Sequence, residues 1–317
     1  MTMRLGATAA LVLGALAAAR ADAPAKFEGG RAYEHVRQFV GIGPRPAGSQ
    51  GLEATRRYIA EQMSAIGVKT AEQAFTAETP LGAIRMVNVI ATIPGARADR
   101  IAIGGHYDTK LYREFRFVGA NDGGSSAAFL IELARVLKAR SNPFTVELLF
   151  LDGEEAMLPD WGPGDHTYGS QHYVEAAKKA GTLAALRAFI LVDMIGDRDL
   201  DIRREQASTP WLTDLIWLSA RRLKQDTAFL NDTELIEDDH VPFLDAGVPA
   251  VDIIDLHYAP WHTAGDTLDK VSARSLQVVG DVLLDALPAI EGRLSKKAPK
   301  PPADAAASPP GPPSRTR

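Results

Sequence analysis

The chain has 317 residues, of which 46% are hydrophobic and 24% charged, a balance typical of a globular protein with one substantial apolar core. Its formal net charge of -5 and the lack of any basic tract argue against a nucleic-acid-binding protein. The sequence contains no cysteine, which excludes disulfides, thiolate metal ligands and a lipid anchor on cysteine.

The N-terminus has the pattern of a secretory signal peptide. Residues 5–19 form an apolar run behind Arg4, and residues 19–21 (Ala-Arg-Ala) fit the small-x-small cleavage motif. A helix that spans a bilayer needs about 20 apolar residues, so this shorter run favours cleavage over an uncleaved anchor. We expect residues 1–21 to be removed and the mature protein to be secreted or periplasmic, without stable membrane insertion.

Apolar periodicity predicts alternating helices and strands across residues 27–294, which we expect to form a single domain. In chain order the predicted elements are a helix at 56–63, strands at 86–93 and 100–105, a helix at 125–137, a strand at 146–151, a helix at 171–180, a strand at 189–193, a helix at 211–223, a strand at 250–254 and a helix at 272–287. Residues 295–317, rich in Pro and Ala, are expected to be a disordered tail.

Strands that alternate with helices favour an α/β fold, in which a mainly parallel sheet is covered on both faces and three layers result. In such sheets the binding site lies beyond the carboxyl ends of the strands. A set of polar residues stands at or shortly after the predicted strands. In chain order they are His106, Asp122, Glu154, Glu155, Asp193 and His262.

Each of these residues has an ordinary structural explanation when taken singly. A lone histidine such as His106 is often only hydrogen-bonded, Asp122 could cap the following helix, and adjacent glutamates usually lie on a solvated face. Taken together, they would bring several like charges into one buried place, which is costly without compensation. A divalent cation removes that cost, and imidazole nitrogen with carboxylate oxygen is a suitable ligand set for zinc.

The adjacent residues Glu154 and Glu155 suggest two different roles for their carboxylates. Neighbouring side chains in extended backbone point in different directions. One carboxylate can therefore bind a metal while the other remains free for proton transfer close by.

Beyond these residue-level arguments, the stretch from about residue 30 to residue 290 resembles the zinc aminopeptidase-like family M28. The resemblance implies an α/β fold with a central mixed sheet, and it implies that Glu154 is the general base. It also implies metal-ligand positions, those of the two-zinc aminopeptidases, for His106, Asp122, Glu155, Asp193 and His262.

Within that family the sequence most resembles the animal-type glutaminyl-peptide cyclotransferases, also called glutaminyl cyclases. The stretches that carry the resemblance are 106–110 (HYDTK), 150–156 (FLDGEEA) with Trp161 and 168–170 (YGS), 237–244 (EDDHVPFL), and Trp261 directly before His262. The sequence departs from that pattern in places. Asp252 stands where the animal enzymes have a histidine that lines the site, and residues 121–126 are closer to the bacterial peptidase branch.

The resemblance to cyclases implies an acyltransferase that acts on the N-termini of peptides or proteins and converts N-terminal Gln to pyroglutamate with release of ammonia. One zinc ion would be held by Asp122, Glu155 and His262. The catalytic residues would be Glu154, which transfers the proton, with Asp193 and Asp238 in a carboxylate network around the substrate amine. Trp161 and Trp261 would wall the substrate pocket.

The main alternative is a zinc aminopeptidase, in which Glu154 would activate a metal-bound water. A second zinc on His106 and Asp193 would then be expected. A non-catalytic binding protein on the same fold is the least expected class, because such proteins lose their ligand set and their catalytic Glu, and this sequence retains both.

Overall fold

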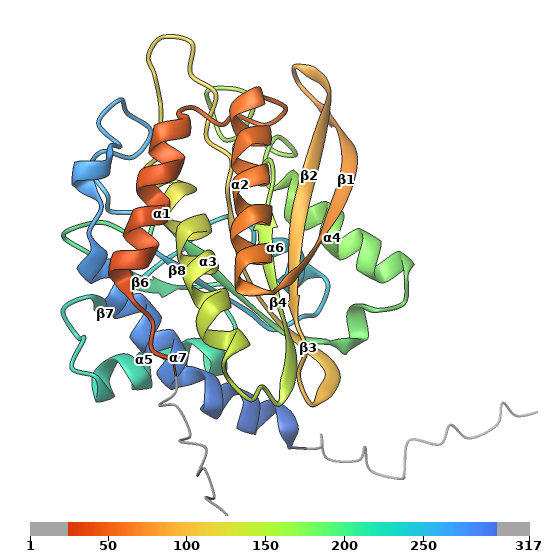
Figure 1. Ribbon diagram of the computed structural model, residues 1–317, viewed down its shortest axis with the longest axis vertical. Helices are drawn as coiled ribbons and strands as arrows, with labels where there is room; N and C mark the ends of the chain where they lie inside the picture. The colour runs from red at the N-terminus through yellow and green to blue at the C-terminus, as the bar shows by residue number, and fades with distance from the viewer. Residues whose placement is uncertain (1–24, 297–317) are drawn as a thin grey trace, which may run out of the picture.

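The computed structural model describes residues 25–296, and the main sheet among these residues has six strands (Figure 1). They are β1 (Lys69–Thr79), β2 (Gly82–Ile93), β3 (Arg97–His106), β4 (Phe144–Leu151), β5 (Leu186–Asp193) and β8 (Ala250–Ile254). Their spatial order is β1-β2-β4-β3-β5-β8. The pairs β1/β2 and β2/β4 are antiparallel, whereas β4, β3, β5 and β8 run parallel. The prediction of a mostly parallel mixed sheet is confirmed.

Helices cover both faces of this sheet. The larger hydrophobic core joins one face to α1 (Gly29–Ile42), α2 (Gln50–Ile66), α3 (Gly124–Lys138), α5 (Pro210–Arg222) and α7 (Ala273–Ser295). A smaller core joins the other face to α4 (Tyr168–Lys179) and α6 (Val241–Asp245). The two-residue alternation of strands explains this division, since Ile101 and Ile103 of β3 enter the first core and Ala102 the second. The predicted three-layer arrangement is therefore confirmed.

Four short elements complete the described part of the chain. Strands β6 (Ile202–Glu205) and β7 (Phe229–Glu234) form a separate two-stranded parallel sheet. Two 3-10 helices, η1 (Leu183–Ala185) and η2 (Leu268–Lys270), lie in connections. The loop that follows β7 contains Asp238, which matters for the site.

The predicted strands all lie within β2, β3, β4, β5 and β8, and the predicted helices overlap α2, α3, α4, α5 and α7. The elements α1, β1, β6, β7 and α6 were not predicted from the sequence. Strand β1 carries little apolar signal because it is an edge strand whose residues are mostly exposed. The predicted signal peptide at 1–21 lies outside the described residues, as does the predicted tail apart from Ser295, which ends α7, and Lys296.

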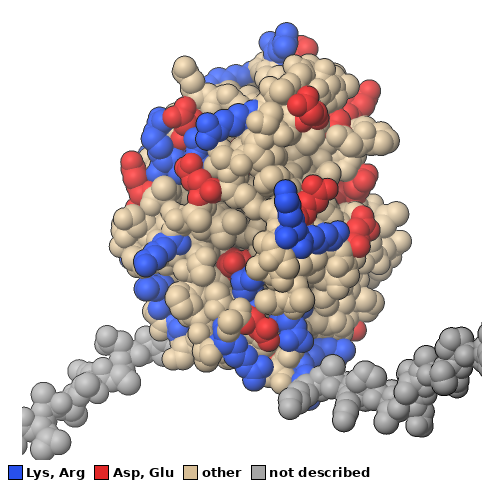
Figure 2. Space-filling view, turned by 90° about the vertical axis from the view of Figure 1, so that its right-hand side faces the viewer, with Lys and Arg blue, Asp and Glu red and all other residues tan. Residues whose placement is uncertain are grey.

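Two surface properties bear on the function classes. Between residues 25 and 296, no helix combines the length and apolar character needed to cross a bilayer. On the face in Figure 2, basic side chains are interspersed with acidic ones over the surface, so that face offers no continuous basic patch for a nucleic acid.

Candidate active site

The parallel strands β4, β3, β5 and β8 end at one edge of the sheet, and the residues singled out in the sequence gather there. Strand β3 ends at His106 and β5 ends at Asp193. The others lie in the loops that follow β3, β4 and β8. They are Asp122, Glu154, Glu155 and His262. The expectation that carboxyl strand ends would bring these residues together agrees with this geometry.

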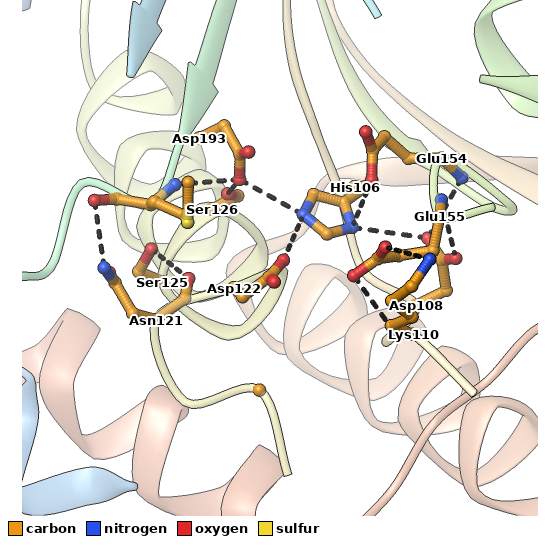
Figure 3. A network of polar contacts seen from close by, with 12 residues as sticks. His106, Asp108, Lys110, Asn121, Asp122, Ser125, Ser126, Glu154, Glu155 and Asp193 are labelled. Atoms are coloured by element: carbon orange, nitrogen blue, oxygen red, sulfur yellow. Dashed lines mark hydrogen bonds and ion pairs between the residues drawn. The ribbon is translucent and has the colours of Figure 1, made fainter. Parts of the chain in front are cut away.

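The first group that could hold a metal ion is His106, Asp122 and Asp193, whose ligand atoms all lie within 4.8 Å of one another. The Nε2 atom of His106 lies 3.1 Å from Oδ1 of Asp193 and 3.2 Å from Oδ1 of Asp122. All three side chains are buried. Figure 3 shows the imidazole of His106 directed between these two carboxylates.

The second group is Asp122, Glu155 and His262, again within 4.8 Å. The Nε2 atom of His262 lies 3.4 Å from Oδ2 of Asp122 and 3.4 Å from Oε2 of Glu155. Among the described residues, neither of these two buried oxygens has a hydrogen-bond partner. Two unpaired carboxylate oxygens beside an imidazole fit a divalent cation such as zinc. Asp122 belongs to both groups.

Backbone geometry fixes Asp122 in this position. The amides of Asn121 and Asp122 donate to Asp266 at 2.9 and 3.1 Å, and the Tyr258 hydroxyl donates to the same carboxylate at 2.7 Å. Gly123 follows with φ of 72°, and a Cβ there would lie 2.3 Å from a backbone oxygen, so this turn requires glycine. The supporting role of Asp266 was not predicted from the sequence.

The two glutamates after β4 point to different sides, as predicted from their adjacency. Their amides donate to the two carboxylate oxygens of Asp108 at 3.3 and 3.4 Å. Oε2 of Glu154 lies 3.6 Å from Nδ1 of His106, whereas Glu155 faces His262 and accepts the Lys110 amide at 3.1 Å. Figure 3 shows Asp108 beneath both glutamates. Asp108 belongs to the HYDTK run, but no role was predicted for it from the sequence.

Burial raises the pKa of three acids at this edge, Asp122, Glu154 and Asp238. Burial and the charge of Glu155 raise the pKa of Asp122 to about 6. The pKa of Glu154 lies well above its ordinary value, because burial and the charge of Asp238 outweigh the attraction of His106. Burial and the charge of Asp193 likewise raise the pKa of Asp238. Such groups keep or gain protons at a pH where exposed carboxylates are ionised.

A second set of buried charges lies behind Asp238. Nε2 of His240 lies 3.1 Å from Glu205, and its Nδ1 lies 3.7 Å from Asp252. The side chains of all three are fully buried. From the sequence, Asp252 was expected at the position of a site-lining histidine, but it lies beside His240 and does not line the cavity. Glu205 and His240 had no predicted role.

A cavity of about 350 Å³ opens onto both metal-compatible groups. The site residues that line it are Asp122, Glu154, Glu155, Asp193, Asp238, Trp161, Trp261 and His262. Trp161 and Trp261 stand at its mouth, 37% and 41% exposed, and so combine apolar area with access to solvent. Aromatic rings in this situation are typical of a ligand pocket rather than of a packed core. His106 lies behind the cavity wall.

Comparison with known proteins matches residues 88–287 to the model of peptidase family M28. The chain is 33% identical over 253 residues to the glutaminyl-peptide cyclotransferase-like protein of Mus musculus, an alignment that covers 70% of this chain and 66% of that one. The crystal structure of an Acidobacteriales bacterium glutaminyl cyclase superposes with a TM-score of 0.82 at 39% identity, covering 88% of this chain and all of that one.

A leucine aminopeptidase precursor from Bacteroides thetaiotaomicron also superposes, with a TM-score of 0.77 at 25% identity and coverage of 84% and 98%. The fold is thus shared by proteins named for two different reactions. The family match extends over more than half of the sequence and includes the strand ends where the site lies, and on that ground the chain belongs to peptidase family M28.

Proposed function

We propose that this protein is a zinc-dependent glutaminyl-peptide cyclotransferase that converts N-terminal Gln of peptides or proteins to pyroglutamate and releases ammonia. The observation that carries the proposal is the cavity itself, in which two half-exposed tryptophans face Glu154, Asp238 and a metal-compatible group. The relatives named glutaminyl cyclases support the same reaction.

Asp122, Glu155 and His262 would hold the zinc ion. Their unpaired oxygens and the imidazole nitrogen border the cavity, which leaves a side open for substrate. The chemistry that zinc supplies when bound is that of a Lewis acid, which polarises a carbonyl group. The peptide's first side chain must therefore enter with its carbonyl toward these three residues.

Glu154 would move the proton. The α-amine nitrogen attacks the side-chain carbonyl carbon of Gln, a new C–N bond forms, and one amine proton passes to the Glu154 carboxylate. The same proton then goes to the departing amide nitrogen, so that ammonia leaves as the old C–N bond breaks. The raised pKa of Glu154 suits the first half, because a carboxylate with increased proton affinity accepts the amine proton more readily than an exposed one, and the second half returns that proton to the leaving nitrogen.

Asp193 and Asp238 would hold the amine in place and share its proton. Both carboxylates line the cavity, and the pKa of Asp238 is raised by burial and by the charge of Asp193. Coupled carboxylates of this kind titrate as a group. Trp161 and Trp261 would enclose the methylene groups of the Gln side chain and keep water from the reacting atoms.

A zinc aminopeptidase is the second candidate, and a specific observation favours it. His106, Asp122 and Asp193 form a further metal-compatible group that shares Asp122 with the first. Two ions, one held by each group, would supply Lewis-acid chemistry suited to hydrolysis of the first peptide bond. We favour the cyclase because of the two tryptophans and the names of the relatives.

The protein would act outside the cytoplasm. The proposed signal peptide at residues 1–21 carries this part of the proposal, and the absence of cysteine suits any redox environment. Peptide and protein N-termini in the periplasm or the extracellular medium would then be the substrates.

The test is to incubate the mature protein with a peptide that begins with Gln and, separately, with leucine amide. Mass spectrometry separates loss of ammonia from an intact peptide from release of a first residue. A Glu154→Gln variant is the control for spontaneous cyclisation, and its rate is expected to fall about 10²- to 10⁴-fold.

Zinc content, measured by plasma mass spectrometry on the same samples, sharpens the result. We expect ammonia loss that depends on Glu154, together with one tightly bound zinc per chain. Release of the first residue with two zinc ions per chain would overturn the proposal in favour of the aminopeptidase.

A further inference from the structure

The loop between β4 and α4 carries Trp161, and its backbone is held at two places. The carboxylate of Asp165 accepts the amides of Met157 and Leu158 at 3.1 and 2.9 Å. The ammonium group of Lys110 donates to the carbonyls of Ala156 and Leu158, both at 3.1 Å. These bonds fix the start of the loop but leave the direction of the Trp161 ring to other contacts.

The contact that meets the ring comes from His166. The centroids of the Trp161 and His166 rings are 4.3 Å apart and their planes differ by 18°, so the rings are stacked. His166 is 6% exposed and Trp161 is 37% exposed. The buried imidazole therefore supports one face of the indole, and the rest of the indole is available to the cavity that it lines.

His166 is itself tied to the catalytic region on two sides. Its Nδ1 lies 3.1 Å from the Thr167 hydroxyl, and the Thr167 amide donates to the backbone carbonyl of Glu154 at 2.8 Å. Its Nε2 lies 3.6 Å from Oε1 of Glu237, which precedes Asp238 and lines the cavity with it. The imidazole of His166 therefore contacts Trp161 on one side and is connected through Thr167 and Glu237 to the segments that carry Glu154 and Asp238.

The backbone conformation of Thr167 restricts the position of the neighbouring His166. Thr167 has φ of 51°, in the left-handed region that a β-branched residue rarely adopts. The bond from its amide to Glu154 and the start of α4 at Tyr168 hold it there. The position of His166 relative to Glu154 is therefore set by the backbone and not by a flexible loop.

We propose that His166 is a positioning residue that holds the Trp161 ring in the orientation in which it contacts the substrate side chain. This inference rests on the proposed function for its kinetic part, because Trp161 is a substrate contact only if the cavity binds the Gln side chain. The contact acts on binding, since His166 lies behind Trp161 and does not itself line the main cavity.

The kinetic test compares His166→Ala, which removes the ring, with His166→Phe, which keeps a stacking ring and loses both nitrogens. We expect KM for a Gln peptide to rise about three- to tenfold in His166→Ala with kcat within about twofold, and to return close to the original value in His166→Phe. In a Trp161→Ala background, His166→Ala should add nothing further to KM.

The chain offers a matched control in His172. It also stacks on an aromatic ring, that of Phe75, at 4.1 Å with an 8° difference between planes, and it lies in α4 away from the cavity. His172→Ala should leave KM and kcat unchanged. An equal rise of KM in both alanine variants would overturn the proposal, because it would trace the effect to α4 in general.

A spectroscopic test needs no catalytic activity. Subtracting the emission of Trp161→Phe from that of the unmodified protein isolates the Trp161 signal, and the same subtraction is made in the His166→Ala background. We expect that signal to move to longer wavelength and to become more accessible to acrylamide when His166 is removed, because the covered face of the indole meets water.

The two tests separate the possible failures. If the protein has no cyclase activity but the Trp161 emission shifts as expected, the proposed function fails and the positioning contact stands. If activity is present and His166→Ala changes neither KM nor the Trp161 emission, the positioning role is wrong. A fall in kcat with unchanged KM in both His166 variants would also refute it, since that result indicates a role in the chemical step.

Discussion

Arg45 and Asp122 are both buried charged side chains, but their surroundings compensate the two charges to different degrees. Arg45 is 0% exposed, and its guanidinium donates at 2.7 to 3.3 Å to four carbonyl groups. These carbonyls belong to Gly43, Tyr107, Val118 and Gly119. Asp122 is nearly as buried, yet its Oδ2 and the neighbouring Oε2 of Glu155 have no hydrogen-bond partner within residues 25–296.

This difference in hydrogen bonding distinguishes a charged side chain that stabilises the fold from charged side chains that form a binding site. Burial lowers the pKa of Arg45 only to about 10, so the group stays charged at neutral pH, and fixed carbonyl dipoles compensate that charge. At the strand ends, the Nε2 atom of His262 lies 3.4 Å from Oδ2 of Asp122 and from Oε2 of Glu155, but neither oxygen has a hydrogen-bond partner among the described residues. A buried acid without a partner is costly, and the fold tolerates that cost where a cation or a substrate amine supplies the missing partner.

The largest expected effect comes from Asp122→Asn, which removes charge from both metal-compatible groups. We expect zinc content to fall and kcat/KM to drop by about 10³-fold, because the site loses part of its hold on the ion and on the polarised carbonyl. The metal-free variant should be at least as stable in urea as the metal-free original, since Asp122 there faces the like charge of Glu155. If the metal-free Asp122→Asn variant were clearly less stable than the metal-free original, Asp122 would stabilise the fold as Arg45 does, and the proposed difference between them would be wrong.

Arg45→Met is expected to act the other way. It leaves four buried carbonyl oxygens without their donor, and we expect the free energy of unfolding to fall by about 3 kcal/mol in urea titrations. At temperatures where the variant is folded, its kcat should stay within a few-fold of the original. An unchanged free energy of unfolding would mean that the guanidinium is replaceable by an apolar side chain.

Glu205 is another buried charge that hydrogen bonds compensate, and we expect its substitution to have a smaller, pH-dependent effect on stability. Burial opposes its charge, but hydrogen bonds from His240, the Ala207 amide and Ser208 prevail and lower its pKa to about 2. We expect Glu205→Gln to cost about 2 kcal/mol of stability near neutral pH.

The sign of the pH effect follows from the lowered pKa. A carboxyl group with a folded-state pKa below its ordinary value of 4.5 stabilises the protein above that value. That contribution is lost as the pH falls from about 4.5 toward about 2. The stability difference between the original and Glu205→Gln, measured by urea unfolding at pH 7, 5 and 3.5, should therefore shrink only below about pH 4.5. A difference that is constant over this range would show that the charge of Glu205 does not matter.

Much of the fold was predictable because its parallel strands are continuous apolar runs. The run at 189–193 became the buried end of β5, and the run at 146–151 became most of β4. Strand β1 was missed because its exposed edge position needs no apolar alternation. Helix α1 was missed although Ala32, Val36 and Phe39 recur at helical spacing and are buried in it. That signal was present in the sequence.

The candidate site divides in the same way. The positions of His106 and Asp193 at strand ends follow from the rule that parallel strands end at one edge. The supports of the site do not follow from any local pattern. Asp266, which accepts a hydrogen bond from the Asp122 amide, is 144 residues away from it in the sequence, and His240 is 35 residues away from Glu205. Contacts across such separations depend on how the layers pack.

The α/β class, the ends of the parallel strands and the residue types that meet there follow from local patterns in the amino-acid sequence, because strand periodicity and chain direction are local properties. Three features become visible only in the folded protein: which carboxylate oxygens lack a partner among the described residues, the position of Asp252 beside His240 and outside the cavity wall, and the contact of His166 with Trp161. These depend on distances between segments remote in the chain, which packing of the layers fixes and no spacing along the sequence specifies.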